Sequence, residues 1–197
     1  MENMNRRQFL VTGCAGVAAL AGLSGCTTTP ASASSPDANL HARREIDAGV
    51  DGALSRLYAT VKGSRELFSK ARAVLVFPDV IGAGFGVGGQ YGKGALRAGG
   101  RTVGYFSTTA GSLGFQAGAQ SRAIFYAFMT RGAYERFRSS SGWSAGADGT
   151  VALVKMGANG MVDTTTAVNP IEAIVLTNAG LMAGVSLEGS KVSRLDI

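Results

Sequence analysis

The stretch between Val80 and Ala95 constrains the fold of this chain more than any other, because glycine occupies every even position from Gly82 to Gly94 except Gln90. In an extended strand, successive side chains point to opposite faces. The spacing therefore predicts a strand with one nearly bare face and one face that carries the larger side chains. Glycine weakens a strand by itself, so we expect the bare face to let another backbone, a helix or a sharply bent neighbouring strand approach closely.

The same stretch contains the letters of a dinucleotide-binding motif, because Gly84, Gly86 and Gly89 form GxGxxG. That motif needs a tight turn that leads directly into a helix. The residues that follow include two more glycines and make a poor start for a helix. A Walker loop is excluded as well, because glycine rather than serine or threonine follows Lys93. The stretch therefore favours a strand over a nucleotide site.

The N-terminus has the pattern of an export signal. Arg6 and Arg7 precede an apolar run over residues 9–23, which is shorter than the ~20 residues of a membrane-spanning helix. The run ends in the sequence LSGC, which resembles the bacterial lipoprotein box and implies cleavage before Cys26 and acylation of that cysteine. Residues 5–10 also resemble a twin-arginine signal, so two export routes stay open. We expect residues 1–25 to be a lipoprotein signal peptide, and a palmitate-type chain on Cys26 to anchor the protein on the periplasmic side of the outer membrane.

Few residues are available for catalysis or metal binding. Cys14 lies in the expected signal and Cys26 would be acylated, so the mature chain would have no free thiol and no disulfide. His41 is the only histidine, so catalytic triads and the usual zinc sites lack their ligands. Catalysis by side-chain oxygens remains, for example by Ser107 or Ser112 paired with Lys93, and no spacing singles one of them out. We expect no enzyme activity, no metal and no cofactor.

The charge of the mature chain points to acidic partners. Removal of residues 1–25 leaves 17 basic and 12 acidic side chains. An exported basic protein meets anionic lipid head groups or acidic polymers rather than nucleic acid. A modest positive charge also simply keeps a domain soluble, so the composition alone leaves both interpretations open.

A flexible tether and a helix are expected to follow the signal. Residues 26–39 consist of the lipidated cysteine and a Ser-, Thr-, Ala- and Pro-rich run that is too polar to bury. Residues 40–197 have the usual size of one domain. In residues 40–62, apolar side chains recur every three or four positions, which predicts an amphipathic helix. The stripe consists of Ile46, Val50, Leu54, Leu57 and Val61.

The pattern then changes to a second short helix followed by strands. Gly63 is expected to end the first helix, and Ser64 to cap a second one over residues 65–71. Pro78 is expected to stop the first strand. Turns are expected at residues 98–100, 110–112 and 178–180, and a loop at residues 142–146 around Trp143. Besides the glycine-striped stretch, the expected strands are residues 73–77, 102–107, 113–129, 151–156, 171–177 and 181–188, with one helix at residues 131–138 capped by Thr130.

Helices first and consecutive strands afterwards predict an α+β fold. We expect the N-terminal amphipathic helices to pack on an antiparallel sheet. The many glycines suggest a strongly curved sheet or a partly closed barrel.

Three runs carry a family resemblance: residues 73–96, 104–120 and 180–195. They are similar to the SYLF family, a lipid-binding domain found beside SH3 and FYVE modules in eukaryotes and alone in exported bacterial proteins. The resemblance implies binding of phosphoinositides or other anionic lipids, partly through a basic amphipathic N-terminal segment, and in fungal members binding of actin. Gly82 stands where the family commonly has a lysine, so the preference for a head group does not carry over.

The expected function is therefore that of a lipid-anchored envelope protein that binds anionic phospholipids or phosphoinositides without catalysis. The alternative is a structural envelope lipoprotein that binds a protein partner. A helix with a charged face can also simply pack its stripe on a sheet and leave the charges in water. The residues expected to contact lipid are Arg43, Arg44, Lys62, Arg65, Lys70, Arg72 and Lys93.

Overall fold

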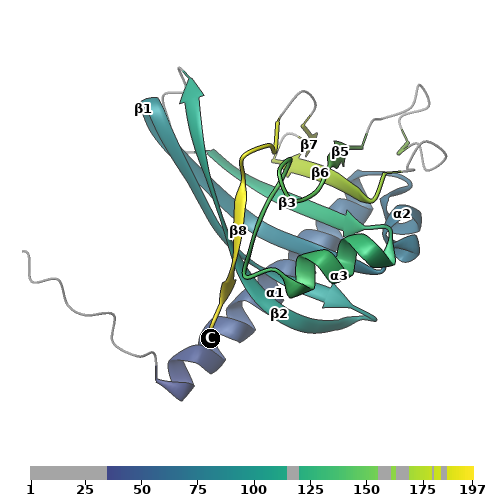
Figure 1. The fold of residues 1–197 in the computed structure, drawn as a ribbon, viewed down its shortest axis with the longest axis horizontal. Coiled ribbons are helices and arrows are strands. Elements are labelled where there is room, and N and C mark those ends of the chain that lie inside the picture. The colour runs from purple at the N-terminus through teal and green to yellow at the C-terminus, as the bar shows by residue number, and fades with distance from the viewer. Residues whose placement is uncertain (1–34, 115–119, 155–160, 163–168, 179, 183–185) are drawn as a thin grey trace, which may run out of the picture. The chain divides into compact units, whose positions relative to one another are not determined.

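The chain has an α+β fold with a strongly curled mixed sheet that forms a half-barrel (Figure 1). The computed structural model describes residues 35–114, 120–154, 161–162, 169–178, 180–182 and 186–197. Within these residues the strand order is β4-β8-β2-β1-β3-β6-β5, and β7 pairs with β6. The expected α+β class and strong curvature are confirmed. The sheet is not purely antiparallel, because β5 runs parallel to β6, which a long connection between the two strands allows.

Helix α1 (Pro36–Thr60) begins four residues before the expected start. The Ser35 side chain accepts a hydrogen bond from the Ala38 amide at 3.2 Å, and Pro36 and Asp37 occupy the first turn. A capping serine, an early proline and an acidic first turn all stabilise a helix N-terminus. These polar residues lie ahead of the apolar stripe, which is why the periodicity alone places the start too late.

Helix α2 (Ser64–Lys70) begins at Ser64, so Ser64 is not its N-cap as expected. Gly63 takes that position with a φ of +83°, a conformation that favours glycine. The buried Ser64 hydroxyl instead donates to the main-chain oxygen of Val61 at 2.6 Å. Ser64 therefore fastens the start of α2 to the end of α1.

Strand β1 (Ala73–Ala98) is long enough to pair with two neighbours. Its first part pairs with β3 (Gln120–Phe128), and its second part pairs with β2 (Arg101–Gly114). The strand does not stop at Pro78 as expected. A register shift between Phe77 and Val80 interrupts the pairing with β3 there, and such a bulge accommodates a residue without an amide hydrogen.

The bare face of β1 packs on the first part of the same strand. A Cβ atom added at Gly92 would lie 2.8 Å from the main-chain oxygen of Asp79, and one at Gly94 would overlap the main-chain oxygen of Val76. The predicted close approach of another backbone is confirmed at these two positions. Gly84 and Gly86 lie outside the residues whose surroundings the structure describes.

The hairpin between β1 and β2 turns at Gly99 and Gly100, as expected, with φ values of +56° and +75°. The turn expected at residues 110–112 is wrong. Gly111 pairs with Gly89 inside the ladder, so β2 continues through it. Of the long strand expected at residues 113–129, Leu113 and Gly114 belong to β2 and Gln120–Phe128 form β3, while residues 115–119 lie outside the described part.

Helix α3 (Arg131–Ser139) has the expected cap, because the Thr130 side chain accepts from the Ala133 amide at 3.3 Å. The loop expected after it contains a short strand, β4 (Gly142–Ser144), which pairs with β8. Burial of Trp143 fixes this segment, since its ring packs against Phe137 and Tyr126.

The remaining strands agree partly with expectation. Strand β6 (Ile171–Thr177) has the expected bounds, and Thr177 pairs with Gly180 in the expected hairpin. The strand expected at residues 181–188 is wrong, because β7 covers Gly180–Leu181 and residues 186–188 are not in a strand; residues 183–185 lie outside the described part. Strand β5 (Val151–Leu153) confirms the start of the strand expected at residues 151–156, of which residues 155 and 156 lie outside the described part. Strand β8 (Lys191–Leu195) was not expected from the sequence.

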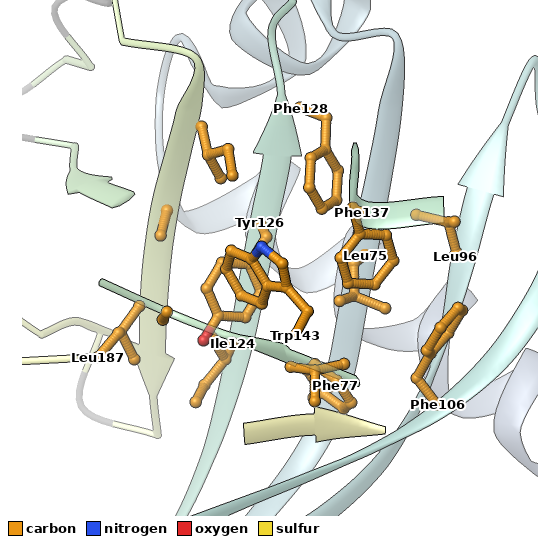
Figure 2. Packing of buried hydrophobic residues seen from close by; sticks show 14 of the residues in the cluster. Leu75, Phe77, Leu96, Phe106, Ile124, Tyr126, Phe128, Phe137, Trp143 and Leu187 are labelled. Carbon is orange, nitrogen blue, oxygen red and sulfur yellow. The ribbon is translucent and has the colours of Figure 1, made fainter. Parts of the chain in front are cut away.

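Two clusters of buried side chains cover the two faces of the sheet. Alternate residues of β3 divide between them: Tyr126 belongs to one and Phe125 to the other. The first, which we call the aromatic cluster, includes residues of α3, β4 and β8 around Phe77, Tyr126, Phe128, Phe137 and Trp143 (Figure 2). The second includes the buried stripe of α1 and α2 (Ile46, Val50, Ala53, Leu57, Leu67 and Phe68). We call the two sides the α3 face and the α1 face.

Candidate functional site

Four of the residues expected to contact lipid lie together at one end of the domain, and we call them the basic end: Lys62, Arg65, Lys70 and Arg72. Lys62 lies between α1 and α2, Arg65 and Lys70 lie on α2, and Arg72 leads into β1. All four side chains are exposed. Their closeness follows from the local chain path, because a seven-residue helix spans only about 10 Å.

Backbone hydrogen bonds and apolar side chains hold the basic end in place. The Val162 amide donates to the main-chain oxygen of Lys62 at 2.9 Å, and the Arg72 amide donates to that of Phe128 at 2.8 Å. Leu67 and Phe68 of α2 are buried. The contact with Val162 also brings Met161 beside Lys62, and 40% of Met161 is exposed. The end therefore combines exposed cations with an exposed apolar side chain.

The basic end has a positive surplus. Lys70 forms an exposed ion pair with Glu66 at 2.8 Å, and this hydrogen bond lowers the pKa of Glu66. The Arg65 guanidinium lies 4.4 Å from the centre of the Tyr58 ring. Burial raises the pKa of Tyr58, and Arg65 opposes part of that rise. Neither Lys62 nor Arg72 forms an ion pair with a described residue, so among the described residues one carboxylate pairs with the four cations.

The other three predicted residues lie elsewhere. Arg43 and Arg44 are on α1, about five turns and roughly 28 Å along the helix from Lys62. The Arg43 side chain donates to the main-chain oxygen of Ile197 at 2.6 Å. Lys93 lies on β1. The structure therefore does not assemble the seven predicted residues into one site.

Lys93 lies in a row of polar residues on the α1 face. Lys93 pairs with Ser107 of β2, and Ser107 pairs in turn with Ser193 of β8. The exposed Lys191 lies two residues from Ser193, so it is on the same face of the sheet. Lys191 was not among the residues expected to contact lipid, because β8 has no clear signal in the sequence. No hydrogen bond joins Lys93 to Ser107 in the described part of the chain, so their pairing gives no sign of a catalytic pair.

An unpredicted network joins α1 to the hairpin of β1 and β2. The Asp47 carboxylate accepts from the Thr102 hydroxyl at 2.7 Å and from the Tyr105 hydroxyl at 2.8 Å. Arg97 lies 3.3 Å from Asp47 and 2.8 Å from Asp51. Burial raises the pKa of Tyr105, and the hydrogen bond to Asp47 adds to the rise. A single helical aspartate gives no sequence signal for contacts with residues 50 or more positions away.

A pocket of ≈ 380 Å³ lies between α3 and the segment after β4. The buried Trp143 forms part of its wall together with Gly149, and the exposed Arg136 and Asp148 also line it. A Cβ atom at Gly149 would lie 3.3 Å from the Trp143 ring, so glycine leaves room there. No motif in the sequence predicts this pocket.

The described residues include no group of three or more His, Cys, Asp or Glu side chains that could hold a metal ion. Among the helices of the described residues, none is both long and apolar enough to cross a membrane. Cys26, the expected site of acylation, lies outside the described part.

A comparison with known families finds a match over the C-terminal part of the chain. Residues 109–196 match the model of the Ysc84 family, which is described as Las17-binding protein actin regulator. The match covers the end of β2 and everything from β3 to β8, and it supports the resemblance to the SYLF family. No curated protein matches the chain.

Proposed function

We propose that the domain binds anionic phospholipids or phosphoinositides through the basic end, and that the chain is a lipid-anchored, non-catalytic envelope protein. The observation that carries this proposal is the basic end itself. Lys62, Arg65, Lys70 and Arg72 are exposed, and the exposed Met161 lies next to Val162, whose amide donates to the main-chain oxygen of Lys62. Among the described residues, Glu66 is the one carboxylate that pairs with any of the four cations. Cations beside an apolar side chain suit the interface of an anionic membrane.

The strength of such binding can be bounded. Each Lys or Arg near an anionic surface contributes roughly 1 kcal/mol, so four contribute on the order of 4 kcal/mol, which corresponds to a Kd of about 1 mM. The attraction fades beyond a Debye length of ~8 Å at physiological salt. Binding by the basic end alone is therefore weak, reversible and sensitive to salt.

An acyl anchor at Cys26 would hold the protein at a membrane independently of this weak binding. Buried acyl chains contribute ~0.8 kcal/mol per CH₂, and two signals together give stable anchoring. The basic end is therefore not needed to keep the protein at its own membrane. Its role would be to select anionic lipids near the anchor or to contact a second surface.

A protein-binding role is the alternative. The matched family is described by a protein that it binds and by actin regulation, not by a lipid. The pocket beside Trp143 lies apart from α2 in the sequence and offers a different surface for such a partner. In that case the exposed charges of the basic end would serve solubility.

A flotation assay distinguishes the lipid-binding function from the protein-binding one. Residues 27–197, produced without the acyl anchor, are mixed with neutral vesicles and with vesicles that contain an anionic phospholipid. We expect flotation only with the anionic vesicles, and less of it as salt is raised. If the protein does not float with anionic vesicles at low salt, the result favours the protein-binding role.

A further inference from the structure

Gln90, the one residue that interrupts the glycine alternation of β1, has a specific contact. Its side chain lies over Gly82, since a Cβ atom at Gly82 would lie 3.3 Å from the Gln90 Cγ atom. The Gln90 amide oxygen accepts a hydrogen bond from the Arg122 guanidinium of β3. Gln90 therefore connects the second part of β1 with β3 and fixes the position of a charged group.

Arg122 is a cation that has no acidic partner among the described residues. It lies on the α3 face of β3, because side chains alternate along the strand and Ile124 and Tyr126 belong to the aromatic cluster. The side chain is half-buried, and burial lowers the pKa of Arg122. Among the described residues, no carboxylate lies within ion-pair distance of it. A partly desolvated cation is costly without a counter-charge, and Gln90 supplies only a neutral acceptor.

A second, independent observation comes from Tyr126. Its side chain is fully buried, and its hydroxyl has no hydrogen-bond partner in the described part of the chain. Burial raises the pKa of Tyr126, while Ser190 and the charge of Arg122 offset part of the rise. Ser190 is buried as well. Arg122, Tyr126 and Ser190 can all donate hydrogen bonds, and none of them brings a negative charge.

We propose that the α3 face of the sheet holds an anion site at Arg122, which binds the phosphate or carboxylate group of a small ligand. Arg122 is the charged partner of the ligand, and Gln90 is a positioning residue that orients the guanidinium without neutralising it. A glutamate at position 90 would keep the shape of the side chain and its hydrogen bond to Arg122. Its carboxylate would, however, neutralise the positive charge of Arg122. This site is separate from the basic end, so it does not depend on the function proposed above.

The test uses the full chain and the fluorescence of its only tryptophan, Trp143, whose ring centre lies 5.8 Å from that of Tyr126. The protein is titrated with inorganic phosphate and, separately, with octanoate, at an ionic strength held constant with chloride. The variants are Gln90→Glu and Arg122→Gln. Matched controls are Asn178→Asp, which adds the same charge at an exposed position, and Arg138→Gln, which removes an exposed arginine.

We expect a saturable change in fluorescence with at least one probe, and binding weakened roughly tenfold or more in both variants but not in the controls. A response to phosphate assigns the site to phosphate groups, and a response to octanoate assigns it to carboxylates. If Arg122→Gln does not fold, Gln90→Glu still tests the proposal. Its new ion pair with Arg122 should keep the midpoint of thermal unfolding at the parent's value. No saturable response to either probe, or a response that survives Gln90→Glu, would overturn the proposal.

Discussion

At the scale of single residues, Gly94 shows why the glycine alternation is needed. An added Cβ atom there would overlap the main-chain oxygen of Val76 and lie 2.7 Å from the Phe77 ring. Backbone atoms cannot move aside as a flexible side chain can, so the two parts of β1 would have to separate. Gly89 is a contrast within the same strand, because nothing lies within 4 Å of its added Cβ atom.

We therefore expect Gly94→Ala to reduce the free energy of unfolding by about 3 kcal/mol or more, and Gly89→Ala to change it by less than about 0.5 kcal/mol. Chemical denaturation of the two variants and the parent measures the difference. Equal losses would mean that the alternation reflects composition and not packing.

The buried hydroxyl of Tyr126 gives a second prediction at this scale. An unpaired buried hydroxyl costs stability, so Tyr126→Phe should unfold with a free energy equal to the parent's or about 1 kcal/mol higher at neutral pH. The pKa of Tyr126 is raised in the folded protein. The unfolded chain therefore releases its proton first, and the parent loses stability as pH rises above about 10.

Phenylalanine has no proton to lose. The difference in the free energy of unfolding between Tyr126→Phe and the parent should therefore increase, in favour of the variant, above that pH. Denaturation curves at neutral and at alkaline pH test both parts. A variant less stable than the parent at neutral pH would show that the hydroxyl has a stabilising hydrogen bond, for which Ser190 is the candidate.

At the scale of elements, the sequence predicts those whose signals are local. Strand β6 has a continuous apolar run, α3 has a threonine cap, and the first hairpin has two adjacent glycines. Strand β8 has only Val192 fully buried among alternating polar residues, so its pairing with β2 leaves little trace in the sequence. The continuation of β1 through Pro78 likewise depends on a bulge against β3, which is a long-range contact.

The attachment of α1 is a testable contact between elements. Asp47 accepts hydrogen bonds from Thr102 and Tyr105, and these bonds involve a charged group, so Asp47→Ala should cost about 2 kcal/mol. Glu45→Ala is the matched control, because Glu45 is exposed two positions away on the same helix. Thermal or chemical unfolding compares them. Equal stability of the two variants would mean that the buried stripe alone holds α1.

At the scale of the whole molecule, the candidate site could be predicted only in part. Lys62, Arg65, Lys70 and Arg72 lie close together because they are close in the sequence. Arg43, Arg44 and Lys93 have the same charge but lie elsewhere in the fold, and one-dimensional spacing cannot reveal this. The pairing of Gln90 with Arg122, 32 residues apart, also requires the folded sheet.

The anchor gives a prediction for the complete protein. Cys26→Ala removes the residue expected to be acylated and leaves the export signal unchanged, so it should abolish both processing and membrane retention. Labelling cells with a radioactive fatty acid measures this directly. Label that persists on the variant would contradict the lipoprotein interpretation.

The most direct test of the account is charge reversal at the basic end. In residues 27–197, Arg65, Lys70 and Arg72 are replaced by glutamate, and the control replaces Arg101, Arg136 and Arg138, which are also exposed, so that both variants change the net charge equally. Flotation with anionic vesicles is measured at low salt, and circular dichroism confirms that each variant is folded. The account predicts that the basic-end variant loses most of its binding while the control keeps most of it. Equal flotation of the two variants would contradict it.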